Sequence, residues 1–110
     1  MDKNHALDAF AALSQSTRLD VFRLLIKAGD AGMSAGDISG TLGVRQNTMS
    51  ANLGVLARSG LIRSEREGRS IRYFADMDGM RGLLAFLMED CCGGRPELCQ
   101  PVINELACAC

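Results

Sequence analysis

Apolar side chains recur at helical spacing in the first part of the chain. Leu7, Phe10 and Leu13 are three residues apart, which predicts a short amphipathic helix over residues 6–13 that packs on something other than its own small core. Residues 18–27 carry apolar side chains over a wide face and predict a second, mostly buried helix. We expect Thr17 to cap its start and Gly29 to end it.

Two short helices joined by a tight turn are predicted next. The first covers residues 35–42, with Ser34 as its expected N-cap and Gly43 as the turn. The second covers residues 45–59, and Gly60 ends it. Its apolar positions recur every three or four residues, as expected for a helix with one face in a core.

A β-hairpin is predicted immediately after these helices. Residues 61–66 and 69–74 are two strand-like segments on either side of the turn pair Glu67-Gly68. Helix, turn, helix and hairpin in this order predict a mainly α fold with a β-hairpin wing. That fold is the winged helix-turn-helix, which reads DNA.

The second helix of this unit has one apolar face and one face of polar or small side chains. At about 100° per residue, Met49, Leu53 and Leu56 fall together and are expected to face the core. The side chains on the opposite side are polar or small, and small side chains let a helix lie deep in a major groove. The side-chain amides of Gln and Asn can make paired hydrogen bonds to adenine. The candidate DNA-contacting residues here are Arg45, Gln46, Asn47, Thr48, Ser50, Ala51 and Asn52.

The positive charge of the chain is concentrated in the same region. The whole chain has a net charge of −1, but residues 45–75 contain six Arg and two Glu, a net charge of +4. Local sign matters more than total charge for contact with phosphates. Arg66, Arg69 and Arg72 flank the hairpin tip, so we expect the wing to reach the DNA backbone or a minor groove.

A long apolar stripe follows the hairpin. We expect a last long helix to begin at Asp76 or Asp78 and to end at Gly93-Gly94, followed by one or two weak helical turns over residues 102–107. The first and last helices together carry more apolar surface than one small domain can cover, which predicts a homodimer. The expected seam residues are Leu7, Phe10, Leu83, Leu84 and Leu87.

The length and composition fit one domain and a short tail. The chain has 110 residues, of which 47% are hydrophobic. We assign residues 1–92 to a DNA-binding and dimerisation domain and residues 93–110 to a cysteine-containing tail. No apolar run approaches ~18 residues and the start carries no signal segment, so we expect a cytoplasmic protein without a membrane partner. No acid–base pair, nucleophile–His arrangement or phosphate loop predicts an enzyme.

Several stretches resemble the arsenic repressor (ArsR/SmtB) family of winged-helix metalloregulators. Ser16–Leu25 resembles its second-helix signature, Leu42–Leu53 with Leu56–Ile62 its recognition helix and exit, and Glu67–Tyr73 its wing. The resemblance covers about residues 6–90. It implies a homodimeric repressor that leaves its operator DNA when a metal or metalloid binds.

The sequence departs from the family at several functional positions. The recognition helix has Arg45 where the family often has Ser, Asn47 for Pro and Asn52 for His. The common Cys-x-Cys metal motif is absent, because residues 34–39 contain no thiol. A second family site uses Asp and His on the last helix, but the only histidine is His5, so that site is absent too.

Five cysteines in the last twenty residues supply the remaining candidate site: Cys91, Cys92, Cys99, Cys108 and Cys110. Thiolates favour soft ions, and As(III) takes three sulfurs in a pyramid. The resemblance is to arsenic repressors whose site lies at the end of the last helix, so we expect Cys91, Cys92 and Cys99 to bind As(III), with Sb(III) as a second inducer. Cys108 and Cys110 are weaker candidates.

Three alternatives remain open at this point. Cys108 and Cys110 could complete a four-sulfur site for Zn²⁺ or Cd²⁺ in a repressor of the same fold. The thiols could instead form a redox or persulfide switch. A protein of another class, which binds soft metals without regulatory DNA binding, would carry the same cysteines.

Overall fold

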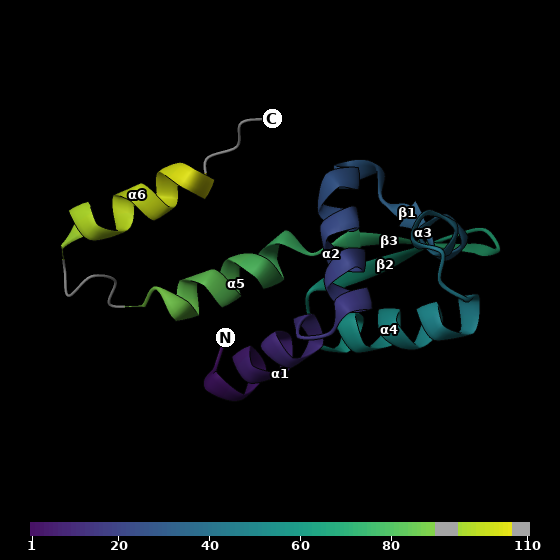
Figure 1. The fold of residues 1–110 in the computed structure, drawn as a ribbon, viewed down its shortest axis with the longest axis horizontal. Helices are drawn as coiled ribbons and strands as arrows, with labels where there is room; N and C mark the ends of the chain where they lie inside the picture. The colour runs from purple at the N-terminus through teal and green to yellow at the C-terminus, as the bar shows by residue number, and fades with distance from the viewer. Residues whose placement is uncertain (90–94, 107–110) are drawn as a thin grey trace.

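The computed structural model describes residues 1–89 and 95–106. Figure 1 shows a body of helices packed around a small sheet, from which the last two helices extend to one side. The elements in chain order are α1 (Lys3–Leu13), α2 (Ser16–Ala28), the 3-10 turn η1 (Gly29–Ala31), β1 (Met33–Ser34), α3 (Ala35–Leu42), α4 (Gln46–Arg58), β2 (Ile62–Glu67), β3 (Ser70–Ala75), α5 (Met77–Leu87) and α6 (Pro96–Leu106).

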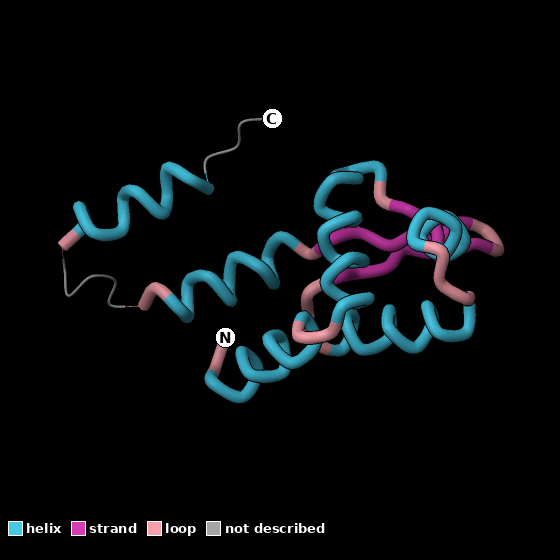
Figure 2. The backbone as a smooth tube through the Cα atoms, in the orientation of Figure 1, coloured by secondary structure: helices cyan, strands magenta, loops and turns pink. Residues whose placement is uncertain are grey.

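The wing is a three-stranded antiparallel sheet with strand order β1-β3-β2 rather than an isolated hairpin (Figure 2). The two-residue strand β1 pairs Met33 with Tyr73, a partnership between segments forty residues apart that the local pattern did not predict. Glu67 pairs with Ser70, so the turn is formed by residues 68–69. The predicted Glu67-Gly68 turn is therefore wrong by one residue. Gly68 has a φ of +60°, which favours glycine at this place.

The predicted helix ends are confirmed at several places and wrong at others. α1 begins at Lys3, three residues before the predicted start at residue 6, because Asp2 caps it by accepting from His5 N. Ser34 caps α3 by accepting a hydrogen bond from Asp37 N, and Asp76 caps α5 by accepting from Gly79 N. Gly29 ends α2, as predicted. The predicted N-cap of α2 is wrong: the Gln15 side chain accepts from Arg18 N, and the helix begins one residue before Thr17.

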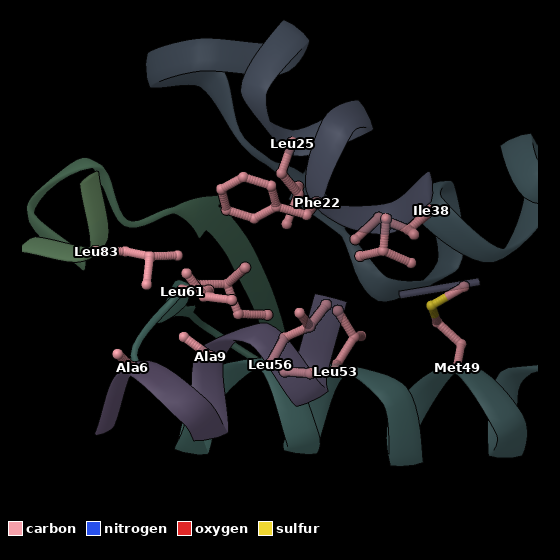
Figure 3. Close-up of a cluster of buried hydrophobic side chains, with 13 residues drawn as sticks. Ala6, Ala9, Phe22, Leu25, Ile38, Met49, Leu53, Leu56, Leu61 and Leu83 are labelled. Atoms are coloured by element: carbon pink, nitrogen blue, oxygen red, sulfur yellow. The ribbon is translucent and has the colours of Figure 1, made fainter. Parts of the chain in front are cut away.

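The core lies where α1, α2, α3, α4, β2 and α5 meet (Figure 3). α1 turns its small residues inward, so Ala6, Ala9 and Ala12 are fully buried. Its large side chains point outward, with Leu7 54% and Phe10 39% exposed. The expectation that this helix packs on something beyond its own core is consistent with this orientation.

Leu83 is a correction to the predicted dimer seam. Its side chain is buried in the core of its own chain, so it has little surface left for a second copy. Leu84 and Leu87 remain 37% and 53% exposed. Both line an open trough whose other wall is α6, so this side of α5 is apolar and only partly covered.

The C-terminal region contains more helix than the sequence pattern predicted. α5 ends at Leu87 and Met88 and Glu89 form a turn, so the predicted continuation of this helix is wrong at these two residues. The rest of the predicted continuation, including Cys91, lies outside the described residues. α6 is an eleven-residue helix that begins at Pro96, so the expectation of one or two weak helical turns over residues 102–107 found the end of this helix but missed its first half. The sequence pattern did not predict the full length of this helix because it contains two prolines. Pro96 occupies its first position, where a missing N–H is tolerated, and Pro101 lies inside it.

The apolar residues of α6 face α5. Val102, Ile103 and Leu106 line a trough together with Met80 and Leu84 of α5. Val102, Ile103 and Leu106 remain 47%, 53% and 62% exposed, so this trough between the two helices is apolar and open. Within the described part of the chain, no helix has both the length and the apolar character needed to cross a bilayer.

Gly79→Ala is expected to destabilise the protein by about 2–3 kcal/mol. A Cβ at this position would overlap the carbonyl oxygen of Gly60, where α5 crosses the loop after α4. Urea unfolding measures the change. Gly40→Ala is the control, because a Cβ on this other helical glycine meets nothing within 4 Å. It should be neutral or slightly stabilising, and an equal loss in both variants would contradict the close approach.

Candidate nucleic-acid interface

The two faces of α4 are divided as the periodicity predicted. Met49, Leu53 and Leu56 are buried in the core, which confirms the predicted inward face. The opposite face is exposed and consists of short polar or small side chains. The exposed residues at its N-terminal half are Gln46, Asn47, Thr48, Ser50 and Ala51.

The N-terminal end of α4 carries unneutralised positive character. Arg45 is the N-cap but makes no side-chain capping bond, and the first turn contains no acidic residue. The Asn47 Oδ1 atom accepts a hydrogen bond from Thr48 N at 2.8 Å. The free amides of this first turn and the helix dipole together favour an anion such as a phosphate.

Asn52 does not belong to this exposed face. Its side chain is 7% exposed, and its Oδ1 atom accepts from Arg18 Nη1 at 3.3 Å. The prediction that Asn52 pairs with a base does not fit this placement, because its amide faces α2. The helical projection put Asn52 on a flank, and only the packing of α2 against α4 decides that this flank is covered.

The wing presents two of its three predicted arginines to the surroundings. Arg66 and Arg69 are exposed and take part in no ion pair within residues 1–89 and 95–106. Arg72 does not fit its predicted role. Its Nη1 atom donates to Ala31 O and Gly32 O at 3.0 Å each, and it pairs with Glu67 at 3.4 Å. Arg72 therefore holds the β1 connection onto β3.

The recognition helix and the wing share one hollow on the surface. Ser50 of α4, Arg69 of the wing and Gly36 at the start of α3 all line it. The tertiary structure thus brings Ser50 and Arg69 to the same hollow, although they are nineteen positions apart in the sequence.

Arg45 and Arg58, at the two ends of α4, are also without an ion pair in the described part of the chain. Cations around an uncharged reading face suit a duplex, whose phosphates border its grooves.

Two buried contacts to α4 were missed by the sequence analysis. Arg18 donates to Asn52 and to the last carbonyls of α1, and His5 contacts Ser59 O at 3.1 Å. An arginine near a helix start and a histidine near the chain start give no local signal of such partners. The contacts join residues 34 and 54 positions apart.

Only one of the five cysteines lies within the described residues. Cys99 is on α6, is 4% exposed, and is disulfide-bonded. The other four candidate ligands lie outside the described residues: Cys91, Cys92, Cys108 and Cys110. Among residues 1–89 and 95–106, no group of three His, Cys, Asp or Glu residues could hold a metal. The expected site of three thiols therefore stays a prediction, because two of its three cysteines lie outside the described residues.

The fold and the surface of α4 define a winged helix-turn-helix DNA-binding domain. A family model described as a helix-turn-helix domain matches residues 13–65, from the end of α1 into β2. No curated protein sequence matches the chain. Several solved structures of transcriptional regulators are similar to the chain.

The chain is similar over nearly its whole length to an ArsR-like transcriptional regulator from Rhodococcus sp. RHA1, at 27% identity and a TM-score of 0.71, with 97% of this chain and 96% of that one covered. HlyU from Vibrio cholerae is 28% identical, with 79% and 97% covered and a TM-score of 0.62. The homodimeric winged helix-turn-helix domain of Mb0332 from Mycobacterium bovis, a possible ArsR-family regulator, is 26% identical, with 77% of each chain covered and a TM-score of 0.65. The chain therefore has the DNA-binding fold of ArsR-like transcriptional regulators.

Proposed function

We propose that this protein is a homodimeric transcriptional repressor of the arsenic repressor family that binds operator DNA and releases it when As(III) binds to its C-terminal thiols. The observation that supports DNA binding most directly is the exposed polar face of α4 between unpaired arginines. α4 would lie in a major groove, with Asn47, Ser50 and Ala51 at the base edges. Arg45, Arg58 and the wing arginines would contact the phosphates.

The proposed dimer uses the outer faces of α1 and α5. Leu7, Phe10, Leu84 and Leu87 form the exposed apolar surface of these two helices, and a second copy would cover it about a two-fold axis. The homodimeric neighbour from Mycobacterium bovis supports this arrangement. Two copies of α4 would then meet successive major grooves about 34 Å apart on a pseudo-palindromic site.

The proposed inducer site consists of Cys91, Cys92 and Cys99, with As(III) as the preferred ligand and Sb(III) as a second one. Within the described residues, Cys99 lies on the inward side of α6, on the helix that lines the trough along α5. A ligand that ties this helix to the end of α5 would alter the packing of the proposed seam. Release requires that As(III) bind the free dimer more tightly than the DNA-bound dimer.

A second candidate function is a repressor controlled by thiol oxidation. The disulfide at Cys99 is the specific observation that favours it, since a cysteine that forms a disulfide has another sulfur within bonding reach. Titration of an operator complex separates the candidates. As(III) should release the reduced protein under the first proposal, whereas peroxide without As(III) should do so under the second.

Arg69→Ala is expected to weaken binding to specific and non-specific duplexes alike, because Arg69 lies at the wing tip and has no ion-pair partner in the described chain. The slope of log K against log salt should fall by about 0.9, the value for one lost phosphate contact. Fluorescence anisotropy over a salt series measures it.

Arg63→Ala is the matched control for the wing. The Arg63 guanidinium lies 4.4 Å from the centre of the Phe74 ring and pairs with Glu65 at 2.7 Å, so its loss should leave the salt slope unchanged. A change of base preference in Arg69→Ala with an unaltered salt slope would show that the wing has been assigned the wrong role.

A further inference from the structure

We propose that Asn52 acts in DNA binding as a positioning residue, held by Arg18, and that α1 sets the orientation of the recognition helix through this pair. The proposal rests on the proposed DNA binding but not on the inducer. It gives Asn52 a different role from the base contact that its place on α4 suggested.

Arg18 joins three helices through one guanidinium group. Its Nε atom donates to Ala12 O at 2.6 Å and its Nη2 atom lies 3.4 Å from Ala11 O. Both carbonyls belong to the last turn of α1, where the negative end of the helix dipole favours a cation; Ala11 O also accepts from Ser14 N at 3.2 Å. The remaining Nη1 atom donates to Asn52 Oδ1 at 3.3 Å on α4. Arg18 itself is on α2.

The orientation of the Asn52 amide follows from the chemistry of its partner. A guanidinium has donors and no acceptor, so the amide oxygen rather than the nitrogen must face Arg18. A side chain that is 7% exposed and oriented in this way cannot present both its oxygen and its nitrogen to an adenine. A bidentate base contact would therefore require the Arg18 bond to break, which leaves a half-buried charge with one partner fewer.

A second contact holds the C-terminal end of the same helix. The Nε2 atom of His5 on α1 lies 3.1 Å from Ser59 O, the residue that caps α4. Between these two contacts, the buried face of α1 is made of alanines (Figure 3), and small side chains allow helices to approach closely. α1 is therefore linked to the middle of α4 through Arg18 of α2 and to its C-terminal end directly through His5.

The consequence concerns specific binding more than affinity for DNA in general. A recognition helix that tilts by a small angle loses its base contacts, whereas flexible arginines still reach phosphates. Loss of the Arg18–Asn52 bond should thus lower the affinity for the preferred site and leave the non-specific affinity and the salt slope nearly unchanged.

The test is a double-mutant cycle on Arg18→Met and Asn52→Leu, which keep the bulk of each side chain and remove the bond. The probe is a duplex selected from a random pool by the wild-type protein. Each single variant should lose about tenfold in specific affinity, the usual worth of a hydrogen bond to a charged group. The double variant should bind no more weakly than Arg18→Met, because both changes break one bond.

Asn52→Asp separates positioning from base reading. A carboxylate still accepts from Arg18, so this variant should stay within about threefold of wild type, whereas Asn52→Leu does not. A base-reading or phosphate-facing Asn52 would make Asp the worse of the two, since its charge repels DNA. Asn47→Leu is the control on the exposed face, and its loss should add to that of Arg18→Met.

Additive losses for Arg18→Met and Asn52→Leu, or a change of base preference in Asn52→Leu, would overturn the proposal. Failure of the proposed function has a different signature, which is a wild-type protein with no preference for any selected duplex. In that event the same cycle, read by hydrogen exchange of the α4 amides in the free protein, still decides the matter. Coupled loss of protection supports the Arg18–Asn52 link, and independent effects refute it.

Discussion

Leu87→Glu is expected to convert the protein to a monomer and to lower operator affinity by more than about 100-fold. The Leu87 side chain is 53% exposed on α5, where it lines the trough toward α6 and belongs to the apolar surface that two copies would bury. A charge there has no partner within the proposed seam and opposes burial. The large effect on DNA follows because a dimer contacts two half-sites, and the second contact is effectively intramolecular.

Light scattering at micromolar concentration and anisotropy with a two-half-site duplex measure both parts of this prediction. Leu19→Glu is the matched control, because Leu19 is similarly exposed, at 43%, but lies on α2 rather than on the proposed seam. It should remain a dimer. A dimeric Leu87→Glu variant, or a wild-type monomer that binds operator with full affinity, would refute the α1–α5 seam.

Cys99→Ser is expected to bind operator normally and to remain bound when As(III) is added. Wild-type protein should lose about 5- to 150-fold in operator affinity at saturating As(III), the usual range of allosteric coupling. Loss of one sulfur leaves two ligands, which cannot complete the pyramidal site. The Cys91→Ser and Cys92→Ser variants should behave in the same way, because each of them also removes one of the three ligands.

The protein must be reduced before this titration, since Cys99 is disulfide-bonded in the structure. A phosphine is the suitable reductant, because dithiols bind As(III) themselves. The control is the pair Cys108→Ser with Cys110→Ser, which should release almost normally. Normal release by Cys99→Ser would exclude the three-thiol site and indicate a two-thiol ligand such as a methylated arsenical. Release of the wild type by peroxide alone would favour the oxidation switch.

Local patterns in the sequence determined the helix-turn-helix and the hairpin that follows it. The bounds of α3 agree with the prediction at both ends, because Ser34 and Gly43 are strong local signals for a start and a stop. The inward face of α4 also followed from periodicity alone. The hairpin was recognised but its turn was misplaced by one residue, since several two-residue pairs around Gly68 are compatible with the strand pattern.

The roles of individual polar residues depended on contacts across the chain. Asn52 and Arg72 looked like exposed DNA-binding residues, yet each is engaged with a distant segment: Asn52 with Arg18 and Arg72 with the carbonyls before β1. Leu83 likewise faces its own core rather than a second copy. A helical projection places residues around one axis, but it contains no information on which neighbouring helix covers each side.

The sequence by itself thus determined the class of fold, the recognition helix and the concentration of positive charge, because short-range signals such as caps, turns and periodicity encode them. Tertiary structure alone decided that β1 joins the wing, that Leu83 faces its own core and that Arg18 links α1 to α4. These features share one physical cause. Each is stabilised by contacts between residues far apart in sequence, and such contacts override weak local preferences.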